Sequence, residues 1–215
     1  MPRQCIVIGC GAHSASVISI IENSNVEYEI LGLVDTADNF DGNEVKSGYK
    51  VISCLSDLLI TPRKFAHLDC VVAVGDNKLR RLIYQKLTDL KFVLPNVVSR
   101  YAVVDHNVHM GQGNLIAHNA VVNSQTIIEN NNLINTSVVV EHHCVIGSSN
   151  HLGPGAVLCG NANLANSIFL GAGSTVLPGV FIENHSTIGA GSVVAEDINI
   201  EHVTVLGVPA RRKSK

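Results

Sequence analysis

Val140-Glu141-His142-His143-Cys144-Val145-Ile146-Gly147 is the stretch of sequence that shows most clearly how the second half of the chain folds. Val140 and Ile146 are apolar and six residues apart, and this spacing extends in both directions. Every sixth residue is apolar and non-aromatic at Val98, Val104, Met110, Ile116, Val122, Ile128, Ile134, Val140, Ile146, Leu152, Leu158, Leu164, Leu170, Val176, Ile182, Ile188 and Val194. In a chain that is 46% hydrophobic, chance gives such a run only about twice in a million.

The other positions of the six-residue unit fit a repeated turn. The residue after the apolar one is often glycine, and the fifth residue is mostly small or β-branched, as in Ala120, Val138, Ala156 and Ser174. An α-helix cannot keep a period of six on one face, whereas a coil of three short strands can. We therefore predict a parallel β-helix over residues 96–215, with five to six coils of about eighteen residues and a C-terminal tail.

The first half of the chain has a different pattern. Apolar runs bounded by turn residues predict strands at 4–9, 28–35 and 69–74, and helical spacing predicts helices at 12–23 and 78–90. In the second helix the apolar positions are Leu79, Leu82, Ile83, Leu87 and Leu90. Alternating strands and helices indicate a small Rossmann-like parallel α/β domain over residues 1–95, which ends at Leu94-Pro95-Asn96.

Composition narrows the class of protein. Only 15% of the residues are charged, against about 25% in an average domain, so we expect part of the surface to be covered in a homo-oligomer. The net charge is -3, and the one basic run is Arg211-Arg212-Lys213. Nucleic acid and anionic membranes are therefore poor candidate partners.

The six cysteines show no disulfide-framework or C-x-x-C spacing. No signal-peptide pattern is seen near the N-terminus, and no apolar run reaches membrane-spanning length. These features predict reduced thiols and a cytoplasmic location. Cys144 and Cys159 are expected to pack in the β-helix.

His142 breaks the apolar pattern of the repeat. Stepping by eighteen residues places Ser124 on one side of it and Gly160 on the other, each about one strand spacing of ~4.8 Å away. Because glycine has no side chain, open backbone should lie beside the imidazole, where a thioester carbonyl could approach a base. The alternative is a surface histidine on a polar face of the coil.

Glycine-rich or polar turns follow three of the predicted strands. Gly9-Cys10-Gly11-Ala12-His13-Ser14 joins a strand to a helix, Asp35 ends the second strand, and Gly75-Asp76-Asn77 follows another. The carboxyl ends of parallel strands share one edge, so these turns could form a nucleotide crevice, although ordinary turn chemistry explains each one alone. Ser14 stands where a dinucleotide fingerprint needs its third glycine.

Together these motifs resemble those of the bacterial sugar acyltransferase and sialic acid O-acetyltransferase family, above all its PglD-like UDP-4-amino-sugar N-acetyltransferases. The resemblance covers nearly the whole chain. Its carriers are Ile8-Gly9-Cys10-Gly11-Ala12-His13, Val34-Asp35, Ala73-Val74-Gly75-Asp76-Asn77-Lys78-Leu79-Arg80, Asn135-Thr136-Ser137, Glu141-His142-His143-Cys144-Val145-Ile146-Gly147 and Leu206-Gly207-Val208-Pro209-Ala210.

The resemblance implies a left-handed β-helix, a homotrimer with active sites between subunits, acetyl-CoA as co-substrate, no metal, and a role in bacterial glycan biosynthesis. His142 would be the general base that takes a proton from the sugar amine, and Asn135 would position the substrate. The implied CoA site comprises His151, Gly160, Ala172 and Ala190. The implied site for the nucleotide sugar comprises Gly11, Ala12, His13, Asp35, Gly75 and Asn77.

The chain departs from the family pattern directly after His142. The family usually has an acidic residue there, and this chain has His143. Either Glu141 supplies the carboxylate that supports the base, or the base is weaker, or the substrate nucleophile differs.

Other functions stay open at this point. The sequence does not decide between N- and O-acetylation, and a sialic-acid-like acceptor is the alternative within the class. It also leaves open the sugar, the position and the length of the acyl chain. A zinc enzyme built on His106, His118, His142 and His151 is less favoured, because His118 and His142 are twenty-four residues apart and fall on different faces of the coil. A non-catalytic trimeric binding module is a third possibility.

Overall fold

The computed structural model describes residues 1–37, 40, 42 and 44–213. The chain begins with a five-stranded sheet of order β3-β4-β2-β1-β5. Its strands are β1 (Arg3–Ile8), β2 (Tyr28–Asp35), β3 (Val45–Lys46), β4 (Tyr49–Cys54) and β5 (Asp69–Val72). All neighbours pair in parallel except β3 and β4, which form an antiparallel hairpin. The buried strands β1 and β5 are rich in Val, Ile and Cys, as expected for a sheet covered on both faces.

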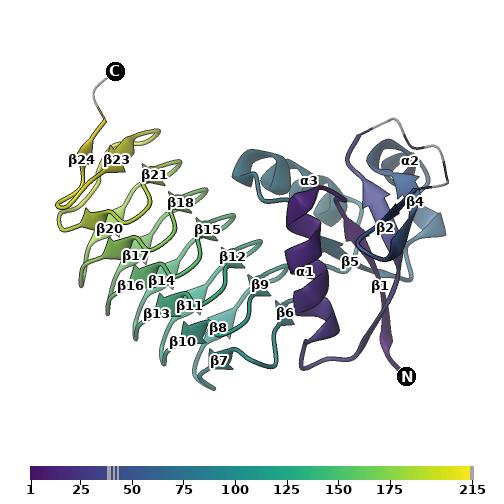
Figure 1. Cartoon of the computed structure of the whole chain (residues 1–215), viewed down its shortest axis with the longest axis horizontal. Coiled ribbons are helices and arrows are strands. Elements are labelled where there is room, and N and C mark those ends of the chain that lie inside the picture. Colours follow the sequence, from purple (N-terminus) through teal and green to yellow (C-terminus); the bar gives the residue numbers. More distant parts are fainter. Residues whose placement is uncertain (38–39, 41, 43, 214–215) are drawn as a thin grey trace.

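Helices cover this sheet on both faces. They are α1 (Ala12–Glu22), α2 (Leu55–Ile60), the 3-10 turn η1 (Pro62–Lys64) and α3 (Asn77–Asp89). Figure 1 shows α1 between the sheet and the second half of the chain. No helix in the described part of the chain is long and apolar enough to cross a bilayer.

Seventeen two-residue strands form the second half as a parallel β-helix. Strand pairs are eighteen residues apart throughout, as in Val121 with Val139 and Val139 with Val157. The strands are β6 (Val97–Val98), β7 (Val103–Val104), β8 (His109–Met110), β9 (Leu115–Ile116), β10 (Val121–Val122), β11 (Ile127–Ile128), β12 (Leu133–Ile134), β13 (Val139–Val140), β14 (Val145–Ile146), β15 (His151–Leu152), β16 (Val157–Leu158), β17 (Asn163–Leu164), β18 (Phe169–Leu170), β19 (Thr175–Val176), β20 (Phe181–Ile182), β21 (Thr187–Ile188) and β22 (Val193–Val194).

Each coil contributes one strand to each of three sheets. We name them the β7 sheet (β7, β10, β13, β16, β19, β22), the β8 sheet (β8, β11, β14, β17, β20) and the β6 sheet (β6, β9, β12, β15, β18, β21, β23, β24). Four residues separate successive strands, and from Gly113 to Gly191 the third of them has a positive φ angle, as at His143 (58°) and Gly155 (67°). This conformation favours Gly, Asn and His, and it explains why such residues recur at the corners.

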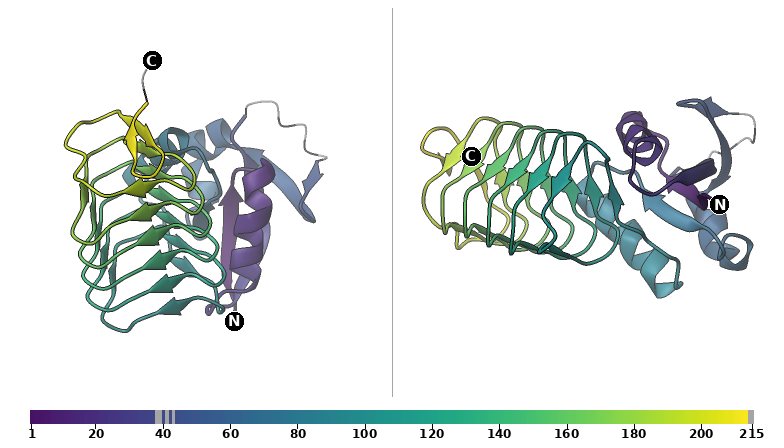
Figure 2. Two further views of the ribbon diagram at one scale, coloured as in Figure 1. Left: turned by 60° about the vertical axis from the view of Figure 1, so that its left-hand side comes forward. Right: turned by 90° about the horizontal axis from the view of Figure 1, so that it is seen from below.

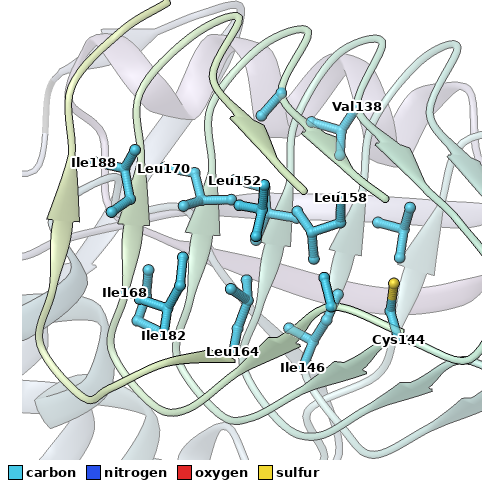
Figure 3. Close-up of a cluster of buried hydrophobic side chains, with 14 of the residues drawn as sticks. Val138, Cys144, Ile146, Leu152, Leu158, Leu164, Ile168, Leu170, Ile182 and Ile188 are labelled. Carbon is cyan, nitrogen blue, oxygen red and sulfur yellow. The ribbon is translucent and has the colours of Figure 1, made fainter. Parts of the chain in front are cut away.

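The predicted six-residue apolar series fills the interior. From Ile116 to Val194 every member of the series is buried, and Figure 3 shows Ile146, Leu164 and Ile182 stacked along one side of the interior in successive coils. Cys144 is buried in the same core. At the far end, β23 (Thr204–Leu206) pairs with β21, and β24 (Arg211–Arg212) folds back on β23 to close the last coil.

The two halves share a hydrophobic core. Val17, Ile20 and Ile21 of α1 cluster with Leu115 and Leu133 on the outer face of the β6 sheet. In Figure 2 the α/β part lies against the first coils, and the later coils extend beyond it. A second cluster on the other face of the α/β sheet joins Leu58 of α2 to Ile83 and Leu87 of α3.

The structure departs from the sequence prediction in two places. The β3–β4 hairpin and α2 were not predicted, because these segments are too short to establish a period. In α3 only part of the predicted apolar face is correct: Ile83 and Leu87 are buried, whereas Leu79, Leu82 and Leu90 are exposed. The buried positions lie at the spacing 80, 83 and 87, so Arg80 takes a core position of that helix.

Candidate active site

His142 lies at a corner of the β-helix, between β13 of the β7 sheet and β14 of the β8 sheet. Its side chain is exposed, although the strands on both sides of it are anchored by the buried residues Val140 and Ile146. The rigid coil therefore presents an accessible imidazole at a fixed point, which suits a group that must meet a substrate.

Gly160 occupies the equivalent corner of the next coil. A Cβ placed there would lie 2.7 Å from Cε1 and 2.9 Å from Nε2 of His142. Real Cβ atoms do not approach so closely, so any side chain at Gly160 would displace the ring. The glycine thus leaves room for the His142 ring to lie against the backbone of the next coil, which is where the eighteen-residue spacing placed it.

The neighbours of His142 differ from those of a carboxylate-supported base. Nδ1 of His142 lies 3.1 Å from Nδ1 of His143, and the rings meet edge to face. Glu141 turns away and accepts a hydrogen bond from Asn123 at 3.0 Å. Among the described residues, no carboxylate forms an ion pair with His142. Within one chain, therefore, Glu141 does not replace the missing acid.

A second polar group lies where the β6 sheet meets the α/β unit. His151 opens β15, and its Nδ1 lies 3.2 Å from the carbonyl oxygen of Gly75, while its Nε2 lies 3.3 Å from Nδ2 of Asn135. The ring of His13, from α1, lies 6.0 Å from that of His151, measured between centroids. His13 and Asn135, which the sequence assigned to different roles, thus both lie next to His151.

Two cavities flank this group. One, of 350 Å³, lies between α1 and the coils and is lined in part by His13, Ser19, His118, Asn135 and Thr136. Nε2 of His13 is buried and has no hydrogen-bond partner, so it is a free polar atom at this junction. The other cavity, of 610 Å³, lies between the start of α3 and the coils, and its lining includes Gly75, Asn77, Phe169, His185 and His202.

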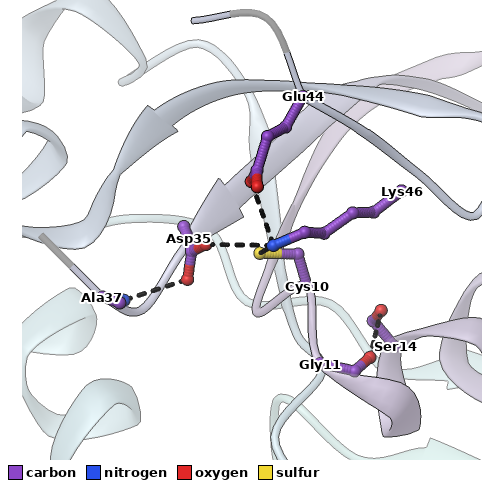
Figure 4. Close-up of polar contacts among 7 residues, drawn as sticks. All are labelled: Cys10, Gly11, Ser14, Asp35, Ala37, Glu44 and Lys46. Atoms are coloured by element: carbon purple, nitrogen blue, oxygen red, sulfur yellow. Dashed lines mark hydrogen bonds and ion pairs between the residues drawn. The ribbon is translucent and has the colours of Figure 1, made fainter. Parts of the chain in front are cut away.

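Two of the turns at the carboxyl edge of the α/β sheet, the one at Cys10 and Gly11 and the one at Asp35, lie close together (Figure 4). Asp35 accepts a hydrogen bond from the backbone N–H of Ala37 at 3.0 Å, and Nζ of Lys46 lies 3.4 Å from its carboxylate and 3.8 Å from Sγ of Cys10. Burial opposes ionisation of Asp35, but these partners outweigh it and lower its pKa. Burial, followed by the Asp35 carboxylate, raises the pKa of Cys10 to about 11, so its thiol stays protonated.

Gly11 and Ala12 are exposed beside this cluster, at the start of α1. The backbone N–H groups of the first helical turn are therefore accessible to an anionic group. Lys46 was not foreseen as part of this edge, because it lies on the short strand β3, which the sequence pattern did not reveal.

The other residues that the sequence assigned to binding sites do not lie together in one chain. The side chain of Asn77 is hydrogen-bonded within the chain: it donates to the carbonyl of Ile168 at 2.9 Å and accepts from Arg80 at 2.8 Å. Ala172 and Ala190 are exposed one coil apart, at corners between the β6 and β7 sheets. Gly160 belongs to a different corner. One chain therefore does not bring together the four residues expected to bind CoA.

Sequence reasoning missed Arg80. Its side chain is 2% exposed and lies between α3 and the β-helix. A cation at an apolar position of an amphipathic helix was the available signal, since the helical pattern placed Arg80 in line with Ile83 and Leu87. Within the described ranges, no three His, Cys, Asp or Glu side chains are grouped as metal ligands would be.

Comparison with known proteins places these features in a family. Residues 4–87 match the family described as the PglD N-terminal domain. Perosamine N-acetyltransferase from Caulobacter crescentus, solved as a histidine-to-asparagine variant with CoA and GDP-perosamine, is 31% identical over 100% of this chain and 98% of its own, with a TM-score of 0.89. This chain belongs to the PglD-like sugar acetyltransferase family.

A second member of the PglD-like family supports the assignment. The acetyltransferase domain of PglB from Neisseria gonorrhoeae FA1090 is 29% identical over 98% of this chain and 100% of its own, with a TM-score of 0.89. That domain has also been solved in complex with acetyl coenzyme A. No curated protein sequence shows significant similarity to this chain.

Proposed function

We propose that this PglD-like acetyltransferase transfers the acetyl group of acetyl-CoA to the 4-amino group of a nucleotide-linked amino-dideoxy sugar in bacterial glycan biosynthesis. The observation that carries the proposal is the His142 corner, where an exposed imidazole lies against the side-chain-free backbone of Gly160. The C. crescentus relative, which was solved with CoA and GDP-perosamine, supports the substrate class.

In the proposed reaction the sugar amine attacks the carbonyl carbon of the thioester directly. A C–N bond forms, the C–S bond breaks, and His142 takes the proton that the nitrogen releases. CoA leaves as a thiolate that then gains a proton. No acetyl-enzyme is required, because the coil can hold the base in place while both substrates are aligned.

The nucleotide end of the sugar is assigned to the carboxyl edge of the α/β sheet. Gly11, Ala12 and Asp35 offer backbone N–H groups and a carboxylate there, and His13 and Gly75 lie on the side towards the β-helix. The sequence resemblance favours a UDP-linked sugar, whereas the C. crescentus relative binds a GDP-linked one. The experiment described below therefore also tests whether the nucleobase of the substrate is uracil or guanine.

We further propose that the active site is completed between the copies of a trimer. His142 and Gly160 lie at the corners that join the β7 and β8 sheets, while Ala172 and Ala190 lie at those that join the β6 and β7 sheets. The outward positions of the β7 sheet, between these corners, are almost all valine: Val103, Val121, Val139, Val157, Thr175 and Val193. Packing this apolar column against other copies would bring the two kinds of corner together.

The proposal is tested by incubating the purified protein with acetyl-CoA and either a UDP-linked or a GDP-linked 4-amino-4,6-dideoxy sugar, and by measuring the release of CoA thiol. Release that collapses in His142→Ala establishes the reaction class and the base. Activity that survives in His142→Ala overturns the role of His142. Release with a sialic-acid-like acceptor alone would assign O-acetylation instead, and zinc in the active protein would contradict the metal-free mechanism.

A cytoplasmic location is also proposed. It is supported by six free cysteines, of which five are buried, since free thiols persist in reducing compartments. Fractionation of cells that express the chain would check it.

A further inference from the structure

Arg80 is a buried cation that forms no ion pair with a carboxylate in the described part of the chain. Its guanidinium makes hydrogen bonds to six acceptors, and all are backbone or amide carbonyl oxygens. Burial lowers the pKa of Arg80 to about 10, so the group stays charged at neutral pH. An unpaired charge in the interior is costly and therefore calls for a specific role.

The six contacts join the two halves of the molecule. Three acceptors belong to the α/β unit: the carbonyls of Val74 (3.3 Å) and Gly75 (3.2 Å) and the side chain of Asn77 (2.8 Å). The other three are the carbonyls of Asn131 (3.3 Å), Ser149 (3.1 Å) and Asn150 (3.0 Å) in the β-helix. The planar fork of an arginine spreads five N–H donors over three nitrogens and can reach carbonyls on both sides at once, whereas a lysine carries three donors on a single nitrogen.

The Gly75 carbonyl links Arg80 to His151. It lies 3.2 Å from Nη1 of Arg80 and 3.2 Å from Nδ1 of His151. A carbonyl only accepts, so Nδ1 of His151 carries the proton. On the other side of the ring, Oδ1 of Asn135 accepts from the N–H of Thr136 at 2.7 Å, which turns the amide nitrogen of Asn135 towards Nε2 of His151.

This network selects one tautomer of His151. The amide nitrogen of Asn135 donates, so Nε2 of His151 must offer a lone pair, and the ring is neutral. The charged and titratable groups that act on this ring are Arg80 on α3 and His13 on α1, and Asp76 acts in turn on Arg80. Burial, and after it the charge of Arg80, lowers the pKa of His151 to about 4.

We propose that Arg80 is a positioning residue of the acetyl-transfer site: it fixes the Gly75 turn against the β-helix and, through the shared Gly75 carbonyl, holds His151 as the Nδ1–H tautomer with its Nε2 lone pair towards Asn135. This inference rests on the proposed function, which assigns His151 and Asn135 to the site. The hydrogen bonds of Arg80 go to carbonyl oxygens and not to the His151 ring, so Arg80 acts only through its neighbours.

The first test uses the unaltered protein. Nitrogen-15 NMR of the histidine rings, recorded from pH 5 to pH 8, should show His151 neutral throughout and protonated at Nδ1. A ring that titrates near the ordinary imidazole value of about 6.5, or that carries its proton on Nε2, overturns the proposal. This readout requires no turnover, so it is independent of whether the proposed acetyl transfer is correct.

The second test compares Arg80→Gln with Arg80→Lys, using Arg81→Gln as the matched control on the next residue of α3. In Arg80→Gln the pKa of His151 should rise by about one unit or more, because a nearby positive charge is lost. The acidic limb of kcat/KM should then steepen, with an additional loss of about ten-fold one pH unit below the raised pKa of His151.

Arg80→Lys should keep His151 neutral but raise KM, because the charge is kept and the fork is lost. Arg81→Gln should resemble the unaltered protein in both respects. If Arg80→Gln folds with an unchanged His151 titration and an unchanged pH profile, Arg80 is only a structural residue. If Arg80→Gln does not fold, the NMR result on the unaltered protein and the behaviour of Arg80→Lys still decide.

Discussion

Gly160 controls the space in which His142 can meet a substrate. We expect Gly160→Ala to push the imidazole aside, because the new Cβ would lie 2.7 Å from Cε1 of that ring. The value of kcat should fall by about 10²-fold, because a catalytic group that is displaced by about 1 Å is no longer aligned with the substrate. The melting temperature should change little, since the exposed ring can move. Steady-state kinetics and thermal unfolding measure the two effects.

Ser124→Ala is the matched control for this change. Ser124 lies one coil away on the opposite side of His142, and the backbone bond from His143 to its carbonyl (3.1 Å) is kept. Removing the Ser124 hydroxyl leaves the position of the His142 ring unchanged, so kcat should be close to that of the unaltered protein. Equal losses in both variants would show that the gap at Gly160 has no special role.

His143 stands where the sequence resemblance leads one to expect an acidic residue, and its Nδ1 lies 3.1 Å from Nδ1 of His142. We expect His143→Glu to raise kcat up to about ten-fold, because a carboxylate would orient the His142 ring and stabilise the positive charge that it gains during proton transfer. His143→Gln has the same shape without the charge and should not raise kcat. A similar kcat in both variants would contradict the electrostatic explanation.

At the scale of an element, a column of asparagines runs along one corner of the β-helix. Asn96, Asn114, Asn132 and Asn150 are eighteen residues apart, and each Oδ1 accepts from the backbone N–H of the next coil. Asn114, Asn132 and Asn150 are fully or almost fully buried. The column therefore satisfies backbone groups that no water reaches.

Asn132→Val should lower the free energy of unfolding by about 2 kcal/mol, because the N–H of Asn150 would be left buried without a partner, while Oδ1 of Asn114 would keep only the backbone N–H of residue 132. Chemical denaturation measures the change. Asn130→Ala is the control, since Asn130 makes a similar bond to the N–H of Gln112 at a more exposed corner, where water can replace it. If both changes cost the same, burial is not the cause.

Elements with a strong period could be predicted from the sequence, and elements without one could not. The β-helix register from Val98 to Val194 and the neighbours Gly160 and His142 follow from the six-residue repeat alone. The β3–β4 hairpin carries no such period, so the contact of Lys46 with Asp35 was missed. Arg80 was missed because the apolar pattern of a helix assigns a cation to the surface. Here, however, the guanidinium is buried and donates to carbonyl oxygens of the β-helix, such as that of Ser149, which is far away in the sequence.

At the scale of the whole molecule, the outward apolar column of the β7 sheet, to which Val139 belongs, should determine the oligomeric state. Val139→Glu should yield monomers without acetyl-transfer activity, because a charge would be buried between copies. Sedimentation velocity measures the state. Val145→Glu is the control: Val145 also points outward, from β14 of the β8 sheet, and is 38% exposed. A trimer that persists in Val139→Glu would refute the proposed arrangement.

The pH dependence of stability should carry the signature of His151. Its pKa is about 4 in the folded chain, against about 6.5 when unfolded. Above pH 6.5 it is neutral in both states and has no effect. As the pH falls towards 4 the unfolded chain binds the proton first, so the free energy of unfolding should drop by about 3 kcal/mol.

Urea unfolding at a series of pH values checks this slope. His151→Asn should be less stable overall but show a shallower decline between pH 6.5 and pH 4. Replacing the exposed His109 by Asn should leave the slope unchanged. If the slope in His151→Asn equals that of the unaltered protein, His151 is not the group that responds to acid.

The stacking of identical coils also restricts how the gene can change in length. Each strand pairs with the one eighteen residues away, so inserting or deleting one whole coil leaves every later residue on its own sheet and at its own corner. An insertion of six residues would keep the interior apolar but would move every later residue to the next corner of the coil. If it fell between His142 and Gly160, the residue beside the imidazole would no longer be Gly160. Homologues that keep the chemistry should therefore differ in this region by multiples of eighteen residues, or by loops that project from a corner.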